Sequence, residues 1–175
     1  MRDERVLFRG VSFALKPGGV LQIIGPNGIG KSTLLRAIAE RQLPGNFCYI
    51  SHKNNFHPAL TVTDNLRFLQ VLLSGSQALN SALQYFGMQQ CANKITNELS
   101  AGQLQCSSLA RLCLTTVKLW ILDEPTVNLD LSAQQLFLNL CAQHVQNGGT
   151  IICATHTILA IATVDSKVLR LQEYV

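Results

Sequence analysis

A glycine-rich segment between an apolar run and a helical pattern constrains this chain more than any other feature. The run Val20–Ile24 is typical of a buried strand, and the apolar residues Leu34, Leu35, Ile38 and Ala39 recur at helical spacing. Between the two lies the pattern Gly, four residues, Gly-Lys-Ser, formed by Gly25, Pro26, Asn27, Gly28, Ile29, Gly30, Lys31 and Ser32. Such glycines allow backbone N–H groups to surround phosphate oxygens at a helix N-terminus. The segment predicts a phosphate-binding loop in which Lys31 neutralises phosphate and Ser32 places its hydroxyl on Mg²⁺.

The composition predicts one folded domain with an apolar core. The chain has 175 residues, of which 47% are apolar and 14% charged. No apolar stretch of 18 residues occurs and the start is charged, so we expect neither a membrane span nor a signal peptide. The net charge of +4 comes without a basic run, so nucleic acid is not an expected partner. The mean hydropathy of +0.21 hints that a partner covers apolar surface.

The six cysteines form no Cys-x-x-Cys pair, which argues against a zinc or thioredoxin-type site. Cys106 and Cys113 lie in an apolar stretch, where buried free thiols are expected. Free thiols in turn indicate a reducing compartment.

Strand and helix patterns alternate along the chain, which predicts a parallel sheet covered by helices on both faces. We expect a hairpin strand over Val11–Leu15, strands at Phe47–Ile50, Leu119–Leu122 and Thr150–Ala154, a helix over about 132–146, and a last helix and strand. The middle of the chain, about residues 63–114, has only helical patterns and is expected to be a helical insertion.

Two further segments carry polar groups that suit phosphate chemistry. Asp123 and Glu124 follow an apolar strand, and in a parallel sheet the strand ends line the ligand crevice. Asp123 is therefore a candidate Mg²⁺ ligand, and Glu124 a candidate base that orients a nucleophilic water. The segment Ser100, Ala101, Gly102 and Gln103 opens a helical pattern; alone it is a helix cap, and beside a phosphate loop it is a second anion site.

These motifs, followed by Asn128-Leu129-Asp130 and His156 in this order and spacing, resemble the ATP-binding subunits of ATP-binding cassette transporters over nearly the whole chain. The resemblance implies an α/β P-loop NTPase fold with a mostly parallel sheet, a helical signature subdomain and a reduced antiparallel subdomain. It implies one ATPase domain, residues 1–175, that binds ATP through residues 25–33, including Thr33, with Mg²⁺ as cofactor. The segment Ser100–Gln103 would contact the ATP of a second copy in a head-to-tail homodimer, and His156 would contact the γ-phosphate.

Within that family, three segments resemble the ATP-binding subunit of the bacterial haem exporter of cytochrome c maturation: residues 2–10, 109–112 and 118–125. This resemblance implies integral membrane subunits as partners and a peripheral position on the cytoplasmic face of the inner membrane. It implies that ATP hydrolysis drives haem export.

The chain departs from the family pattern at four places. His52 or Lys53 falls where the family has a glutamine that couples Mg²⁺ to the membrane partner, and Cys106 stands where an arginine usually follows the signature. Arg2 aligns near the family's adenine-stacking aromatic, and Leu43–Asn46 replaces a longer segment of the antiparallel subdomain. These departures affect the affinity for nucleotide and the coupling of Mg²⁺ to the membrane partner.

Two functions from different classes are compatible with the sequence. The first is an ATPase that powers a membrane transporter, which the intact Lys31, Asp123, Glu124 and His156 favour. The second is a weakly hydrolysing, nucleotide-dependent regulatory or assembly module, which the departures favour. A cassette ATPase of DNA repair or translation fits poorly, because only 69 residues separate Lys31 from Ser100.

Overall fold

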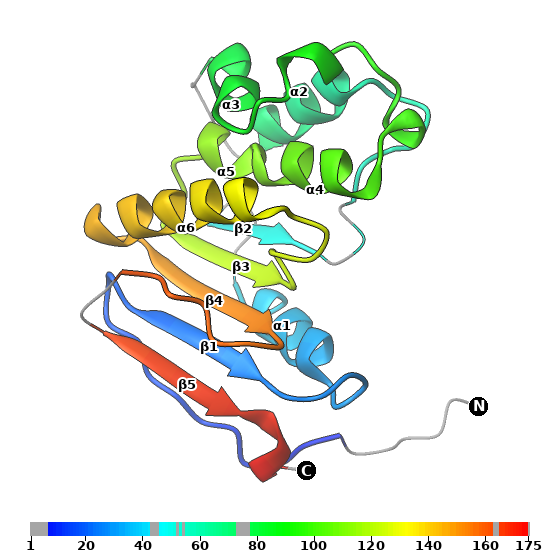
Figure 1. Ribbon diagram of the computed structural model, residues 1–175. Coiled ribbons are helices and arrows are strands. Elements are labelled where there is room, and N and C mark those ends of the chain that lie inside the picture. Colours follow the sequence, from blue (N-terminus) through cyan, green and yellow to red (C-terminus); the bar gives the residue numbers. More distant parts are fainter. Residues whose placement is uncertain are drawn as a thin grey trace.

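The structure is a computed structural model that describes residues 7–42, 46–51, 53, 55–72, 78–162 and 165–174. Strands and helices alternate in its first and last thirds, and helices alone occupy the middle (Figure 1). In chain order they are β1 (Val20–Ile24), α1 (Lys31–Ala39), β2 (Phe47–Ile50), α2 (Val62–Leu72), α3 (Leu79–Tyr85), η1 (Gln89–Cys91), η2 (Thr96–Glu98), α4 (Ala101–Leu109), α5 (Arg111–Leu114), β3 (Leu119–Asp123), α6 (Leu131–Gln146), β4 (Thr150–Thr155), β5 (Ser166–Arg170) and η3 (Leu171–Tyr174).

The strands form one sheet in the order β2-β3-β4-β1-β5, and every neighbouring pair is parallel. β1 lies between β4 and β5, so the loop that leaves β1 opens at the carboxyl edge of the sheet beside the ends of β3 and β4. The parallel sheet and the α/β P-loop NTPase fold expected from the sequence are confirmed. Among the described residues no helix is long and apolar enough to cross a membrane.

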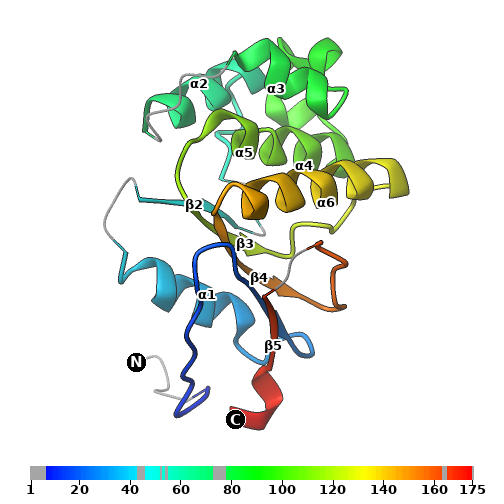
Figure 2. The ribbon, with the colours of Figure 1, turned by 90° about the vertical axis from the view of Figure 1, so that its left-hand side faces the viewer.

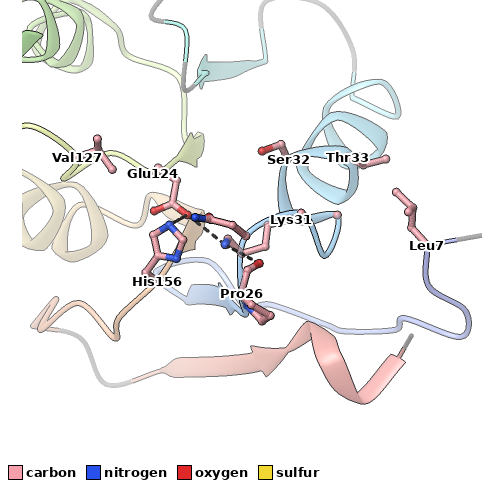
Figure 3. A pocket seen from close by; sticks show the side chains of 11 residues that line it. Leu7, Pro26, Lys31, Ser32, Thr33, Glu124, Val127 and His156 are labelled. Carbon is pink, nitrogen blue, oxygen red and sulfur yellow. Dashed lines mark hydrogen bonds and ion pairs between the residues drawn. The ribbon is translucent and has the colours of Figure 1, made fainter.

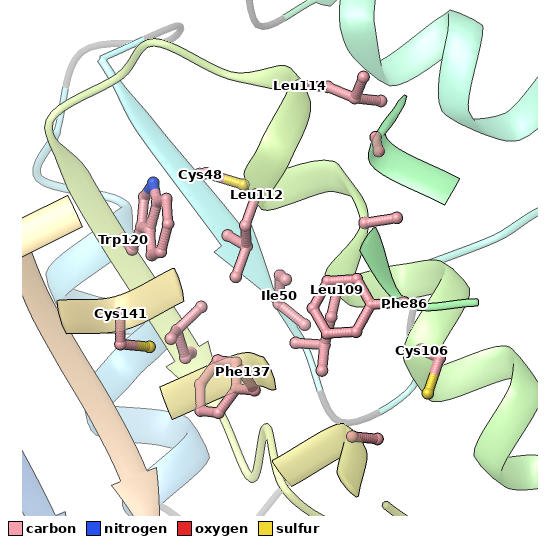
Figure 4. Packing of buried hydrophobic residues seen from close by; sticks show 14 of the residues in the cluster. Cys48, Ile50, Phe86, Cys106, Leu109, Leu112, Leu114, Trp120, Phe137 and Cys141 are labelled. Carbon is pink, nitrogen blue, oxygen red and sulfur yellow. The ribbon is translucent and has the colours of Figure 1, made fainter. Parts of the chain in front are cut away.

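The two faces of the sheet belong to different apolar clusters, as the alternation of side chains along a strand requires. In β3, Trp120 points to the face covered by α6 and the middle helices, where it belongs to one cluster with Phe137 (Figure 4). Leu122 belongs to the same cluster. Ile121 points to the opposite face and packs with Leu35 of α1. Figure 2 shows α1 and α6 on opposite sides of the sheet. All six cysteines are free, and five are buried, as expected.

Two buried polar side chains hold the segment that joins β2 to α2: Asn65 ties it to α2, and Thr96 ties it to the segment before α4. Asn65 is 5% exposed, and its Oδ1 accepts from His57 N at 2.7 Å while its Nδ2 donates to Thr61 O at 2.9 Å. Thr96 is 3% exposed and donates from Oγ1 to His57 O at 2.9 Å. Leu60 O also accepts from Thr96 N at 3.1 Å. Because Thr96 lies four residues before Ser100, its bonds to His57 and Leu60 connect the segment after β2 with the segment that leads into α4.

Two sequence predictions about single elements are wrong. The expected helix after β4 is absent from the described residues 156–162, because the side chain of Gln22 in β1 satisfies the backbone there. Its Oε1 accepts from Leu159 N at 2.7 Å and its Nε2 donates to Leu159 O at 3.0 Å. The expected strand Val11–Leu15 is also absent. In that segment, Val11 and Leu15 pack against the apolar cluster on the α1 face of the sheet, which contains Leu35 and Ile121 and which we call the α1-side cluster. The segment does not pair with a neighbouring strand of the described residues.

The antiparallel part of the fold is small in the described residues. The only antiparallel pairing there is an isolated bridge between Thr61 and Ile95. Leu43–Gly45, in the segment expected to replace a longer part of this subdomain, lie outside the described residues, as do Arg2 and His52.

Candidate functional site

The glycine-rich loop leaves β1 at the carboxyl edge and ends where α1 begins at Lys31. Gly28 has φ 79° and Gly30 has φ 109°, a conformation that glycine adopts without the strain that a Cβ would cause. A Cβ on Gly30 would also lie 3.2 Å from a ring carbon of Phe8. The loop therefore keeps its curved shape, with the N-terminus of α1 directed at the space outside the sheet.

Lys31 joins the loop to the end of β3. Its Nζ donates to Gly25 O at 2.7 Å and to Pro26 O at 3.3 Å, and it lies 3.3 Å from Glu124 Oε1 (Figure 3). His156, which follows β4, places Nε2 3.2 Å from the same Glu124 oxygen. Lys31 is 6% exposed and the Glu124 side chain 11%, so this ion pair is largely buried, whereas the His156 side chain is 44% exposed and closes the group on the solvent side.

Glu124 has a left-handed backbone with φ 51°, which is uncommon for a residue other than glycine. Its N–H donates to Ala154 O at 2.9 Å, and the carbonyl of Pro125 accepts from the buried Gln105 Nε2 at 2.7 Å. Contacts on both sides of the residue hold this conformation, and the side chain is thereby directed toward the loop instead of into the sheet. Strained positions held in this way are frequent at functional sites.

These groups border a cavity of about 570 Å³ at the carboxyl edge. Its wall contains seven of the nine residues expected to bind ATP, both expected catalytic residues, and two residues that the sequence did not single out: Pro26, Asn27, Gly28, Gly30, Lys31, Ser32 and Thr33; Glu124 and His156; Leu7 and Val127. The two remaining loop residues contribute differently. Gly25 supplies a carbonyl to Lys31, and Ile29 packs inward on the α1-side cluster.

Asp123 and Ser32 provide the oxygen atoms that suit a divalent cation. Asp123 is 3% exposed, and its Oδ1 has no hydrogen-bond partner among the described residues. Asp123 and Ser32 both line a second cavity, of about 280 Å³, beside the first. A buried carboxylate oxygen without a partner and a nearby hydroxyl are hard ligands of the kind Mg²⁺ prefers, so the two predicted metal ligands fit this ion.

The segment Ser100–Gln103, which we call the signature segment, lies apart from the 570 Å³ cavity. Ser100 caps α4: its Oγ accepts from Gln103 N at 3.2 Å, and Gln103 Oε1 accepts from Ser100 N at 3.1 Å. Ser100, Gly102 and Gln103 line a different cavity, of about 300 Å³, and none of residues 100–103 lines the 570 Å³ cavity. A Cβ on Gly102 would lie 2.9 Å from Asn128 O, so glycine is required for this close approach.

Two of the departures from the family pattern fall within the described residues. Lys53 lines the 280 Å³ cavity together with Asp123. Cys106 lies in the wall of the 300 Å³ cavity, where burial raises the pKa of its thiol and the Asp130 carboxylate raises it further. The 570 Å³ cavity has no Phe, Tyr or Trp ring in its described wall, because Phe8 packs on Gly30 and Leu7 takes the wall position.

Comparison with known sequences identifies the family. The family model described as ABC transporter matches residues 8–46 and 39–127, together more than half of the chain. The cytochrome c biogenesis ATP-binding export protein CcmA of Paracoccus denitrificans is 40% identical over 171 residues, which cover 93% of this chain and 80% of that protein. The protein of the same name from Bartonella quintana is 41% identical over 180 residues, covering 91% and 86%.

Solved structures agree on the fold. A putative ABC transporter ATP-binding protein from Pyrococcus furiosus superimposes with a TM-score of 0.80 at 21% identity, covering 98% of this chain and 93% of that one. A dimeric ATP-binding cassette bound to ADP and phosphate gives a TM-score of 0.76 at 22% identity, covering 90% and 83%. Together with the sequence matches, these comparisons show that the chain belongs to the ABC transporter family, among the ATP-binding subunits related to the cytochrome c biogenesis export proteins.

Proposed function

We propose that this chain binds Mg²⁺ and ATP at the 570 Å³ cavity and hydrolyses ATP to drive an export transporter. The observation that carries the proposal is the convergence of Lys31, Glu124 and His156, with contacts of 3.3 Å and 3.2 Å, in the wall of one cavity beside a phosphate loop. Such a group combines a cation for phosphate, a base for water and a second polar contact, which are the parts that phosphoryl transfer to water needs.

Each residue has a distinct role in this proposal. Lys31 leaves its carbonyl partners to neutralise the β- and γ-phosphates, and the backbone N–H groups of residues 27–33 enclose them. Glu124 accepts a proton from the attacking water, and His156 contacts the γ-phosphate. Ser32 and Asp123 would hold Mg²⁺, which neutralises charge on the phosphate oxygens when it is bound.

We propose further that the working unit is a homodimer of this single domain, residues 1–175. In a head-to-tail arrangement, Ser100, Ala101, Gly102 and Gln103 of one copy close the phosphate site of the other. The separation of the signature segment from the 570 Å³ cavity within one chain supports this arrangement, because one copy alone leaves the cavity without those donors. The helices within about residues 63–114 carry that segment.

The cargo and the partners are proposed from the relatives. Proteins named as cytochrome c biogenesis ATP-binding export proteins are 35–43% identical to this chain over most of its length. We therefore propose that the cargo is haem, that integral membrane subunits bind the chain, and that it lies at the cytoplasmic face of the bacterial inner membrane. Two exposed apolar residues of α2, Phe68 at 65% and Val71 at 80%, are in keeping with a covered surface there.

The weakly hydrolysing regulatory module remains the alternative, and the presence of Lys53 and Cys106 favours it. Steady-state turnover separates the two functions. An ATPase should release phosphate from Mg·ATP at a rate that Lys31→Ala abolishes, whereas a regulatory module should bind Mg·ATP and dimerise with little turnover. In cells, deletion should remove holo c-type cytochromes and leave b-type haem proteins intact; normal c-type cytochromes would refute the haem cargo only.

A further inference from the structure

We propose that Gln22 is a positioning residue for His156: it fixes the segment after β4 to β1 and thereby holds the His156 ring beside Glu124. The proposal rests on the proposed ATPase function, in which Glu124 accepts a proton from water and His156 contacts the γ-phosphate. It gives a part in that reaction to a residue that does not belong to the described wall of the 570 Å³ cavity.

Gln22 places a polar side chain in the middle of an apolar strand. Its neighbours in β1, among them Leu21 and Ile23, are buried and apolar, and Gln22 itself is 1% exposed. Burial of an amide costs free energy unless its oxygen and its nitrogen both find partners. Here Oε1 accepts from Leu159 N at 2.7 Å and Nε2 donates to Leu159 O at 3.0 Å. The amide therefore holds both backbone groups of one residue, which an apolar side chain could not do.

The span that carries His156 is fixed to β1 at both of its ends. At its start, Thr155 ends β4 and pairs with Ile24 of β1. At its far end, Leu159 is bound by Gln22, two residues before Ile24 in the same strand. Figure 1 shows the segment after β4 running back across the sheet toward the start of β5. His156 is thus the first of three residues between two anchors on one strand.

Further bonds within the span narrow the freedom of its backbone. Thr155 Oγ1 donates to Thr157 O at 2.8 Å and accepts from Thr157 N at 3.3 Å. The His156 side chain is 44% exposed, so packing surrounds the ring only in part and the backbone has to set its place. Loss of the Gln22 bonds would free the far end of the span and leave the pairing of Thr155 intact.

The strand that anchors the span also carries the phosphate loop. β1 ends at Ile24, and Gly25 of the loop is the next residue. The loop brings Lys31 Nζ to 3.3 Å from Glu124 Oε1, and the span brings His156 Nε2 to 3.2 Å from the same oxygen. Because one buried strand holds both, their spacing is set before ATP binds. This matters because a misplacement of about 1 Å can lower a reaction rate about 10²-fold.

The kinetic test compares Gln22→Met with the parent in steady-state turnover of Mg·ATP by the full chain. Methionine fills a similar space without a cavity, but it cannot bind the backbone of Leu159. We expect kcat per folded chain to fall about tenfold or more, while the KM for ATP changes less than about threefold because the phosphate loop is unaltered. In a His156→Ala background the same substitution should cost less than about twofold, since the group that it positions is gone. Equal losses in both backgrounds would refute the role.

Asn65→Leu is the matched control for a lost buried amide. Asn65 also accepts from one backbone N–H and donates to one backbone carbonyl, those of His57 and Thr61, and it does not line the 570 Å³ cavity. The control should weaken the fold in urea to a similar extent as Gln22→Met, yet keep kcat and KM within about twofold of the parent. If both variants lose kcat equally, the effect is general and the positioning role is overturned.

A measurement without turnover separates this proposal from the proposed function. In the nucleotide-free full chain with isotope-labelled histidine, the NMR signals of the His156 ring are identified by their loss in His156→Ala. Glu124→Gln should shift these signals in the parent and in Asn65→Leu, and shift them much less in Gln22→Met, because the ring has left the carboxylate. Equal shifts in all three refute the positioning role. If the signals behave as expected but the parent has no Mg·ATP turnover, the proposed function has failed and the contact stands.

Discussion

Replacement of Glu124 by glutamine tests the proposed chemistry most directly, because it changes one charge and almost no shape. The glutamine side chain keeps an oxygen that can accept from Lys31 Nζ, which now lies 3.3 Å from Glu124 Oε1. It also leaves the left-handed backbone at φ 51° to the same neighbouring contacts. The properties that are lost are the ability to accept a proton from water and the negative charge that faces Lys31.

The expected loss of turnover is on the order of 10²- to 10⁴-fold, the contribution of a positioned general base. This corresponds to about 3 to 5 kcal/mol of the activation barrier. The affinity for ATP should rise, because Lys31 no longer has to leave a carboxylate before it contacts phosphate. If that ion pair contributes about 1 kcal/mol, the gain is about fivefold.

Both quantities can be measured on one preparation. Turnover is followed by phosphate release with Mg·ATP, and affinity by a fluorescent ATP analogue competed with ATP. The ATP-bound dimer of the variant should persist in size-exclusion chromatography because hydrolysis no longer dissolves it. Glu40→Gln, an equal charge change at an exposed position at the end of α1, serves as control and should retain parental turnover. A Glu124→Gln protein with more than one fifth of parental turnover would refute the assignment of the base.

Four further outcomes follow from the same geometry. Lys31→Ala should abolish measurable ATP binding in equilibrium dialysis, because the phosphates lose their one buried cation. ATP and GTP should bind within about fivefold of each other in competition titrations, since the described cavity wall has no Phe, Tyr or Trp ring to stack on a base, a contact of about 1 kcal/mol. Asn65→Ala should lower the free energy of unfolding in urea by about 2 kcal/mol, against less than about 0.5 kcal/mol for the exposed Gln135→Ala. Burial lowers the pKa of His144 to about 4, so folding stability should fall as the pH drops from about 6.5 toward 4. In urea titrations at pH 7 and pH 5, His144→Phe should reduce the difference between the two free energies of unfolding. An unchanged difference would contradict the claim that burial of His144 makes stability depend on pH.

The phosphate-loop site was predictable because its signals are local or follow from one rule of topology. The glycine spacing placed the loop, and the rule that parallel strands end at one edge brought Asp123 and Glu124 to it. The helical middle and the sheet were predictable for a similar reason, since periodicity reports burial directly. The signals for these features lie close together in the sequence, although the sheet itself pairs strands as far apart as β1 and β4.

The features that were missed depend on contacts between segments far apart in sequence. The side chain of Gln22 binds the backbone of Leu159, 137 residues away, where the sequence predicted a helix after β4. The signal for this contact in the sequence was a polar residue within an apolar strand. Tyr49 and Lys53 form a cavity with α1 only because β2 lies next to β3 in the sheet. The sequence shows that Ser32 and Arg36 lie on one face of a helix, but it does not show which residues lie opposite that face.

In the proposed homodimer, the cap of α4 would allow Ser100–Gln103 to contact the phosphate of a second copy while it stabilises its own helix. Ser100 Oγ uses its lone pair to accept from Gln103 N, so its hydroxyl hydrogen remains free to donate to a phosphate oxygen. Gln103 Oε1 satisfies the Ser100 N–H, and the N–H groups of Ala101 and Gly102 lie at the positive end of the helix. Gly102 also brings this end close to Asn128 O, in the segment that follows Glu124, where a Cβ would lie 2.9 Å from that oxygen. In the proposed homodimer, the segment after β3 and the residues Ser100–Gln103 are therefore in direct contact within one copy.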